Sequence, residues 1–193
     1  MNYRDAFRRC FFASLALYLV SVVVLADDEK EKPETREAKF NELVLNVPAT
    51  WEDQEPSSKL RLGQFGVPAS EGDGEGGQVV VSSFPGGGGG VDMNIPRWLG
   101  EFSADGRSIK VKSGTSAQGE YVIADVQGTH VGSSFSRRKV PLEDARLLVV
   151  VLHVKDENYF VKLTGPKKTV TEAEEAFRAA FGGNAEEEKD YEF

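Results

Sequence analysis

The stretch that decides the fold is residues 146–154, which read RLLVVVLHV. Alternate residues of a strand point to opposite faces, so the apolar side chains of this stretch divide into two sets. One face would carry Leu147, Val149 and Val151, and the other would carry Leu148, Val150 and Leu152. Because a strand that is apolar on both faces must be covered on both, we predict a central strand in a sheet with helices on its two sides.

A turn and a partner strand follow. Residues 155–158 (KDEN) are typical of a turn. Residues 159–164 then return as a strand, which Gly165 and Pro166 end. The pair predicts an antiparallel hairpin at the centre of the sheet. Residues 132–144, upstream of it, are polar and interrupted by proline, so we expect a loop there.

Further short strands complete the sheet. Each is a small apolar group bounded by Gly, Pro or Ser, which is typical of strands and turns. They are expected near residues 40–47, 60–65, 79–81, 109–111 and 121–126. With the hairpin they predict a mostly antiparallel sheet of about six or seven strands.

A first helix is expected after the glycine-rich stretch at residues 86–90. Asn94 would be its N-cap, since Asn accepts hydrogen bonds from free helical N–H groups. The following apolar residues have the i, i+3, i+4, i+7 spacing of one buried helical face. These residues are Ile95, Trp98, Leu99 and Phe102.

A second helix is expected from about residue 170 to residue 181. Thr171 and Glu174 have the spacing of a capping box. Gly182 follows as a typical C-terminal stop. The two helices and the sheet predict an α+β fold, in a single domain over residues 40–183.

The beginning of the chain resembles an export signal. Arg4, Arg8 and Arg9 precede an apolar run of about 15 residues at positions 11–25, and small residues follow up to Ala26. The run is shorter than the roughly 18 to 20 residues of a membrane span. We therefore expect residues 1–26 to be a signal peptide cleaved after Ala26, with membrane anchorage only if cleavage fails.

Composition then limits what the exported part can do. Removal of the signal takes 3 of 23 basic and 1 of 31 acidic residues, which leaves 20 against 30 and a net charge of −10. This charge argues against nucleic acid as a partner. The single cysteine, Cys10, lies in the signal, so disulfides and thiolate metal sites are excluded from the exported part. Residues 27–39 and 184–193 are acidic and poor in aliphatic residues, so we expect a disordered linker and a disordered tail.

Three stretches of the domain resemble a known family. They are Val47-Pro48 with Trp51 close behind, Asn94-x-x-Arg97-Trp98 running on to Glu101-Phe102, and Tyr159-Phe160-x-Lys162-Leu163-Thr164-Gly165-Pro166. Together they resemble an uncharacterised family of exported bacterial proteins. The resemblance covers most of residues 40–181 and implies the Mog1/PsbP type of α/β/α sandwich. By analogy with that fold, it also implies a role in binding a partner or assisting its assembly.

Candidate chemistry in the sequence is sparse. The glycine run before the first helix lacks the Gly-Lys-Ser/Thr of a phosphate loop, and Asp92 places negative charge there. A metal or acid/base site would need His130 and His153 to meet beside a carboxylate such as Asp125. His153 continues the face of Leu147 and is expected to be a half-buried packing residue. The sequence therefore predicts neither catalytic nor metal-binding residues, and no cofactor.

Asn94, Arg97 and Trp98 are the candidate contact residues for a ligand or partner. An arginine on a short helix can hold an anionic group beside an aromatic face. Alternatively, Trp98 belongs to the core and Arg97 pairs with a carboxylate at the edge of the sheet.

Two functional hypotheses follow. The first is a non-enzymatic binding or assembly module of the cell envelope, periplasmic or extracellular, whose partner is a protein or another envelope component. The second is a metal-binding protein or enzyme built on His130, His153 and nearby carboxylates.

Overall fold

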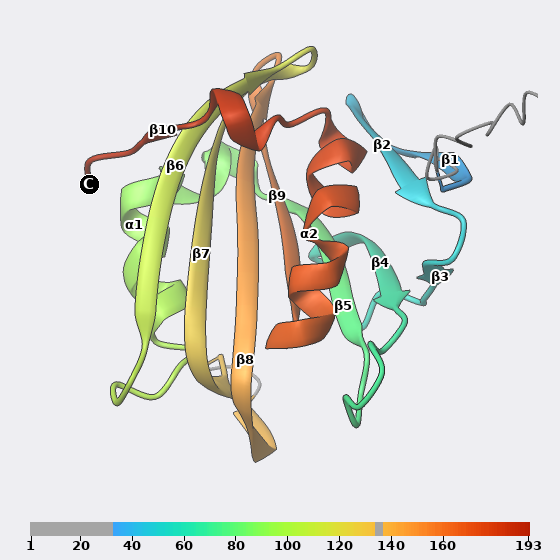
Figure 1. The fold of residues 1–193 in the computed structure, drawn as a ribbon. Coiled ribbons are helices and arrows are strands. Elements are labelled where there is room, and N and C mark those ends of the chain that lie inside the picture. Colours follow the sequence, from blue (N-terminus) through green and yellow to red (C-terminus); the bar gives the residue numbers. More distant parts are fainter. Residues whose placement is uncertain (1–32, 134–136) are drawn as a thin grey trace, which may run out of the picture. The chain divides into compact units, whose positions relative to one another are not determined.

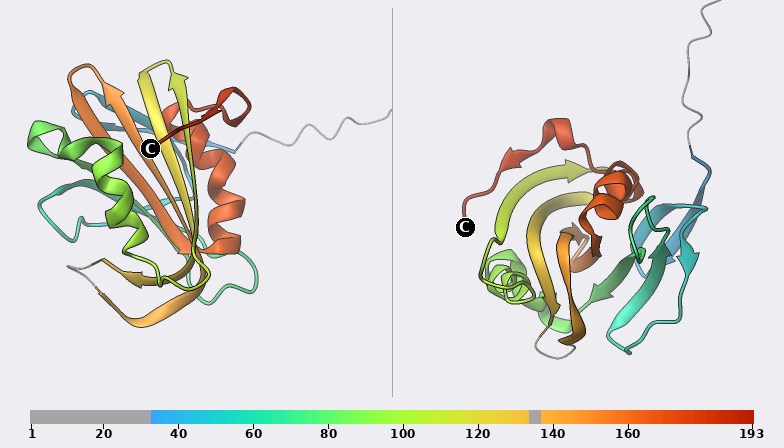
Figure 2. Two further views of the ribbon diagram at one scale, coloured as in Figure 1. Left: turned by 90° about the vertical axis from the view of Figure 1, so that its left-hand side faces the viewer. Right: turned by 60° about the horizontal axis from the view of Figure 1, so that its bottom comes forward.

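The computed structural model describes residues 33–133 and 137–193. The predicted signal peptide and residues 27–32 of the predicted linker lie outside the described residues. Within the described part, an antiparallel sheet has the strand order β10-β6-β7-β8-β9-β5-β4-β3, and β1 and β2 form a separate hairpin. Figure 2 shows α1 and α2 on opposite faces of this curved sheet. The predicted α+β class with helices on both faces is confirmed.

The bounds of the elements, in chain order, are as follows. The strands and helices are β1 Thr35–Phe40, β2 Leu43–Pro48, β3 Glu52–Asp53, β4 Arg61–Val67, β5 Gly77–Ser83, α1 Gly90–Leu99, β6 Ser108–Ser116, β7 Gly119–Gly132, β8 Arg137–Val154, β9 Glu157–Pro166, α2 Lys167–Phe181 and β10 Lys189–Asp190 (Figure 1). Short 3₁₀ turns occupy Pro85–Gly89 and Ala185–Glu187. The main sheet has eight strands in the described part, which is more than predicted. Strands β3 and β10 were not predicted because each has only two residues.

Strand β8 separates two hydrophobic cores, as its sequence predicts. The side chains of Leu148, Val150 and Leu152 pack on the α2 side, with β2, β4, β5 and β9. Those of Leu147, Val149 and Val151 pack beneath α1. Each such aliphatic side chain contributes about 1.5 to 3 kcal/mol when fully buried. The burial of both faces therefore fixes β8 near the centre of the sheet.

The loop predicted for residues 132–144 is wrong for residues 137–144, which belong to β8. This part of β8 pairs with β7 across two irregularities beside His130, while pairing with β9 begins only at Ala145. In the described structure no strand pairs with the other edge of this part of β8, and Pro141 is tolerated there because an edge strand needs fewer N–H donors. Backbone pairing of this kind leaves no hydrophobic pattern in the sequence.

Helix α1 begins at Gly90, with Gly89 as its N-cap, five residues before the predicted N-cap Asn94. The preceding turn is left-handed, since Gly86 to Gly90 have φ between 67° and 88°, a region that costs little only for glycine. Asn94 lies inside the helix and is not its N-cap. Its Nδ2 donates to the carbonyls of Gly88 and Gly90, at 2.8 and 2.6 Å. The amide thus holds the glycine turn against the helix.

Helix α2 also begins before its predicted start, at Lys167, so the predicted capping box at Thr171 and Glu174 is wrong. Thr171 donates to the carbonyl of Lys167, and both predicted cap residues contact Arg146 of β8. These polar side chains serve the contact between helix and sheet. The predicted end is confirmed, because Gly182 has φ 79° and caps the last turn.

Two segments expected to be disordered contain regular structure. Residues 35–39 of the predicted linker belong to β1, which pairs with β2 from Thr35 to Phe40. In the predicted tail, β10 pairs with β6, and the N–H of Tyr191 donates to the carbonyl of Val111 at 3.0 Å. Both segments are ordered by backbone pairing and a few anchoring side chains, which charge composition does not reveal.

Candidate functional site

The α1 side of the sheet carries a groove that runs along β5 and β9. Two adjoining hollows form it, with volumes of about 730 and 910 Å³, and they share Val80, Glu101, Ser133 and Lys162. The floor consists of alternate residues of the two paired strands, which face the same side. These are Gln78, Val80 and Ser82 of β5 opposite Thr164, Lys162 and Phe160 of β9. We call this feature the α1-side groove.

The structure brings the three predicted contact residues together in the larger hollow. Asn94, Arg97 and Trp98 all line it. Trp98 is 6% exposed and belongs to the core beneath α1. Most of its side chain is therefore a packing residue, as the alternative interpretation of the sequence predicts. Arg97 is exposed and its Nη1 donates to Asn94 Oδ1 at 3.2 Å. Among the described residues, it has no ion pair with a sheet-edge carboxylate.

The end of the groove beside α1 is apolar. Phe84 and Phe160 pack edge to face with ring centroids 5.5 Å apart, and Trp98, Val149 and Pro96 line the same hollow. Gly88 makes this arrangement possible, because a Cβ at that position would lie 2.7 Å from the Phe160 ring. This end can accept an apolar group.

A buried ionic cluster forms the waist of the groove, where the two hollows meet. Lys162 Nζ lies 2.6 Å from both carboxylate oxygens of Glu101, and His130 Nε2 lies 3.3 Å from Glu101 Oε2. Burial alone would raise the pKa of Glu101. The hydrogen bonds from His130 and Lys162 and the charge of Lys162 outweigh burial, so the pKa of Glu101 lies below its usual range.

Backbone pairing holds Glu101 in this position. Its carbonyl accepts the N–H of Val131 at 2.8 Å, and Phe102 bridges to His130, so residues after α1 continue as an extra edge along β7. Glu101 and Lys162 both lie in the stretches that carry the family resemblance, yet sequence reasoning did not single them out as a site. The available signal was a charged residue with apolar neighbours in each stretch.

The other end of the groove is a polar surface made of amides. Gln54 Oε1 accepts from Gln64 Nε2 at 2.9 Å and from Gln78 Nε2 at 3.3 Å. Arg61 Nη1 donates to Gln64 Oε1 at 2.6 Å and to Gln78 Oε1 at 3.4 Å. Gly66 lets Gln54 lie across β4, since a Cβ there would lie 2.6 Å from the Gln54 amide nitrogen. This end can exchange hydrogen bonds with polar groups.

The rival histidine site is not assembled. His130 pairs with Leu142 of β8, whereas His153 lies near the far end of the same strand, just before the turn to β9, on the order of 30 Å away in an extended chain. Asp125 is bound to Arg146. His153 is exposed, with its Nδ1 2.9 Å from Asn158 Oδ1, so the expectation of a half-buried packing residue is wrong. Within residues 33–133 and 137–193, His, Cys, Asp and Glu form no group that could hold a metal ion.

His130 nevertheless has an unusual environment in the groove. The residue is 8% exposed, and its Nδ1 has no hydrogen-bond partner among the described residues. Its ring packs on Phe102 with centroids 5.1 Å apart. An unpartnered buried nitrogen is costly.

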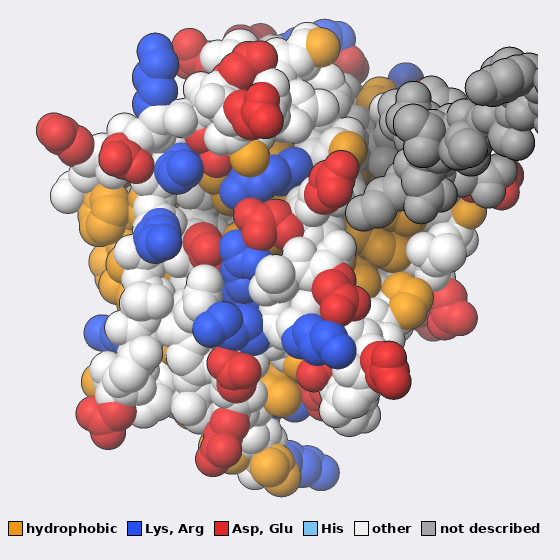
Figure 3. All heavy atoms as spheres, in the orientation of Figure 1, with side chains coloured by type: hydrophobic (Ala, Val, Ile, Leu, Met, Phe, Trp, Pro, Cys, Tyr) orange, Lys and Arg blue, Asp and Glu red, His pale blue; other side chains and the backbone are white. Residues whose placement is uncertain are grey.

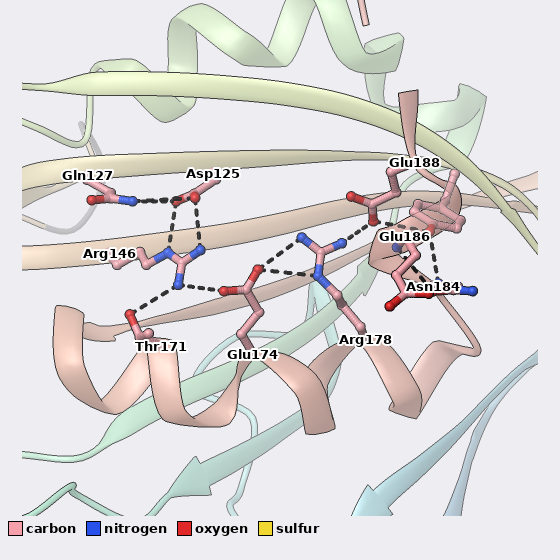
Figure 4. Close-up of polar contacts among 10 residues, drawn as sticks. Asp125, Gln127, Arg146, Thr171, Glu174, Arg178, Asn184, Glu186 and Glu188 are labelled. Carbon is pink, nitrogen blue, oxygen red and sulfur yellow. Dashed lines mark hydrogen bonds and ion pairs between the residues drawn. The ribbon is translucent and has the colours of Figure 1, made fainter. Parts of the chain in front are cut away.

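The opposite side of the sheet holds a row of alternating charges, shown in Figure 4. The Arg146 guanidinium donates hydrogen bonds to both carboxylate oxygens of Asp125, at 3.0 and 2.9 Å, and lies 2.7 Å from the Glu174 carboxylate. Glu174 in turn binds Arg178 at 3.0 Å, and Arg178 binds Glu188 of the C-terminal segment. Figure 3 shows basic and acidic side chains interleaved over this face. The row ties β7, β8, α2 and the C-terminal segment together.

In the described part of the chain, the helices are too short or too polar to span a membrane.

Comparison with known proteins bears on the fold alone. No family model and no curated protein matches the sequence. Solved structures similar to this chain include a Pseudomonas aeruginosa protein of unknown function, PA94 (18% identity, 76% of this chain and 92% of that one, TM-score 0.43). They also include the Saccharomyces cerevisiae Ran-binding protein Mog1p (12%, 75% and 85%, 0.43) and PsbP of the cyanobacterium Synechocystis (11%, 84% and 96%, 0.48). The chain is thus similar in fold to Mog1 and PsbP proteins, as the sequence resemblance predicts.

Proposed function

We propose that this protein is an exported, non-enzymatic binding or assembly module whose partner docks in the α1-side groove. The observation that carries the proposal is the convergence of Asn94, Arg97 and Trp98 with Phe160 and Lys162 along one hollow. An apolar surface beside a few placed polar groups is the usual composition of a binding site.

The form of the groove supports a macromolecular partner. Small-molecule sites enclose most of their ligand, whereas this groove runs beside α1 and past its end, over the paired residues of β5 and β9. A partner lying along it would touch both the aromatic end and the amide end. We therefore infer that the partner is a protein or another envelope component.

The proposed location rests on the first 26 residues. Cleavage after Ala26 would release the domain to the periplasm or the extracellular space. Intact mass spectrometry of protein recovered from its native host should show a chain that begins at Asp27. A full-length mass would contradict cleavage and would make the protein membrane-anchored.

Blocking the groove tests the docking proposal. Val80 is half-buried and lines both hollows, so Val80→Trp should fill the waist. Thr115→Trp is the matched control, because Thr115 is exposed on β6 and lines neither hollow. Pull-downs from the envelope fraction should recover a partner with the wild type and with Thr115→Trp, and lose it with Val80→Trp. Equal recovery by all three proteins, each shown to be folded by circular dichroism, would refute the docking site.

A further inference from the structure

The charges of the groove identify the chemistry of its occupant. Two of its four Lys and Arg side chains are already neutralised, because Arg138 binds Glu75 at 2.8 and 3.0 Å and Lys162 binds Glu101. Arg61 and Arg97 differ. Among the described residues, their side-chain hydrogen bonds go only to the amides of Gln64 and Gln78 and of Asn94, respectively.

These two guanidinium groups line different parts of the same groove. Arg61 lines the hollow that contains the amides of Gln54 and Gln78, and Arg97 lines the aromatic hollow. Arginine side chains match carboxylates by a two-pronged hydrogen bond, and amide oxygens satisfy them without neutralising their charge. Glu52, at the rim of the groove, is the one carboxylate of the lining residues that has no ion pair in the described structure. The uncompensated lining charge is therefore positive, although the chain as a whole carries −8.

The length and surface of the groove indicate an extended chain. Its floor runs from Gln78 to Ser82 along β5, which corresponds to roughly 13 Å of strand. One end offers an aromatic hollow, and the other offers side-chain amides, each of which has two N–H donors and can therefore also bind a peptide backbone. A segment of about six residues would reach from these amides to Phe84 and Phe160.

Resting on the function proposed above, we propose that the occupant of the α1-side groove is an extended acidic peptide segment of a partner protein. Its carboxylates bind Arg61 and Arg97, and an apolar side chain enters the hollow formed by Phe84, Trp98 and Phe160. The amides of Gln54 and Gln78 bind the backbone of the segment. Salt weakens the binding, because the arginines that carry it lie at the surface of the groove.

Selection of peptides tests this directly. A display library of fully randomised hexapeptides is selected on the purified protein, and recovered peptides are measured by fluorescence anisotropy. We expect peptides with at least one Asp or Glu and one large apolar residue. Arg61→Glu and Arg97→Glu should each weaken them roughly tenfold, as loss of a charge pair in an interface does. Lys110→Glu is the matched control, because Lys110 is exposed on β6 and lines neither hollow.

Three results would overturn the inference. They are recovery of basic or uncharged peptides, recovery of acidic peptides that bind Val80→Trp as well as the wild type, and failure to enrich any peptide. None of these decides the proposed function, which stands as long as Val80→Trp loses the envelope partner and Thr115→Trp keeps it. Conversely, acidic peptides that depend on Arg61 and Arg97 support the inference even before a native partner is found.

Discussion

The two faces of the eight-stranded sheet share their strands but differ in how their charged side chains are paired. On the α2 side, Asp125, Arg146, Glu174 and Arg178 form a continuous row in which each guanidinium is neutralised by carboxylates. On the α1 side, two arginines of the groove bind only amides among the described residues, and a buried histidine nitrogen has no partner there. Satisfied charges hold a structure together, whereas unsatisfied ones are available to a ligand. Ion pairs thus stabilise the α2 face, and the α1 face is the one on which we propose that a partner binds.

The largest effect should come from removing Arg146 on the α2 side. Arg146→Ala leaves the carboxylates of Asp125 and Glu174 without their shared cation, and breaking such a buried pair costs about 3 to 5 kcal/mol. Urea unfolding would measure the loss. Arg138→Ala, which breaks an exposed pair with Glu75, should cost at most about 1 kcal/mol. Equal losses for the two variants would break the comparison between the faces.

The next largest effect should come from the glycine turn. At Gly88, alanine would combine a positive φ of 67° with a Cβ 2.7 Å from Phe160, so we expect a loss of about 2 to 4 kcal/mol. Gly86→Ala is the control, because it has φ 76° but open space around its Cβ, and should cost about 1 to 2 kcal/mol. Thermal or urea unfolding of both variants separates backbone strain from steric overlap. A Gly88→Ala protein no less stable than Gly86→Ala would contradict the close packing of this turn.

Glu101, at the waist of the groove, should make the stability of the protein depend on pH. The folded-state pKa of Glu101 is lowered, so its contribution to stability is present above its unfolded pKa and is lost as pH falls through the folded value. The stability difference between wild type and Glu101→Gln should therefore be largest near pH 7 and shrink below about pH 4.5. Urea unfolding at a series of pH values measures it. A difference that grows on acidification would show that the pKa of Glu101 is raised.

The smallest effect on stability should come from the two groove arginines, where binding is expected to change most. Replacing Arg61 and Arg97 together with Gln removes no ion pair within the described residues, so unfolding free energy should change by about 0.5 kcal/mol or less. Peptide affinity should fall while the unfolding curve stays in place. A loss of stability comparable to that of Arg146→Ala would mean that the α1 side is structural too.

Hydrophobic periodicity was sufficient to predict the centre of this fold. The two faces of β8, its hairpin with β9 and the burial of Ile95 and Trp98 on α1 all follow from it. Phe102, expected on the same helical face, is buried but lies after the helix ends at Leu99. Elements held by backbone pairing were not predictable in this way. β1, β10 and the first part of β8 are polar or charged, and their order depends on strands that are distant in sequence.

The candidate site was predictable only in part. Arg97 and Trp98 stand out in sequence as an arginine beside an aromatic residue on a short helix, and both line the groove. The polar end of the groove is formed by Gln54, by Gln64 of β4 and by Gln78 of β5. No local sequence pattern connects these three residues. The two helix starts were misplaced because Asn94 and Thr171 use their polar atoms for the glycine turn and for Arg146.

The two-residue strands β3 and β10 have a consequence for how recognition can evolve. They occupy both edges of the sheet, which reduces the open backbone on which another strand could be added. The partner that we propose would then be recognised mainly through side chains on a face of the sheet. Backbone recognition is largely indifferent to sequence, but recognition by side chains can be retuned one substitution at a time. The scaffold can therefore exchange one partner for another while its strand pairing remains unchanged.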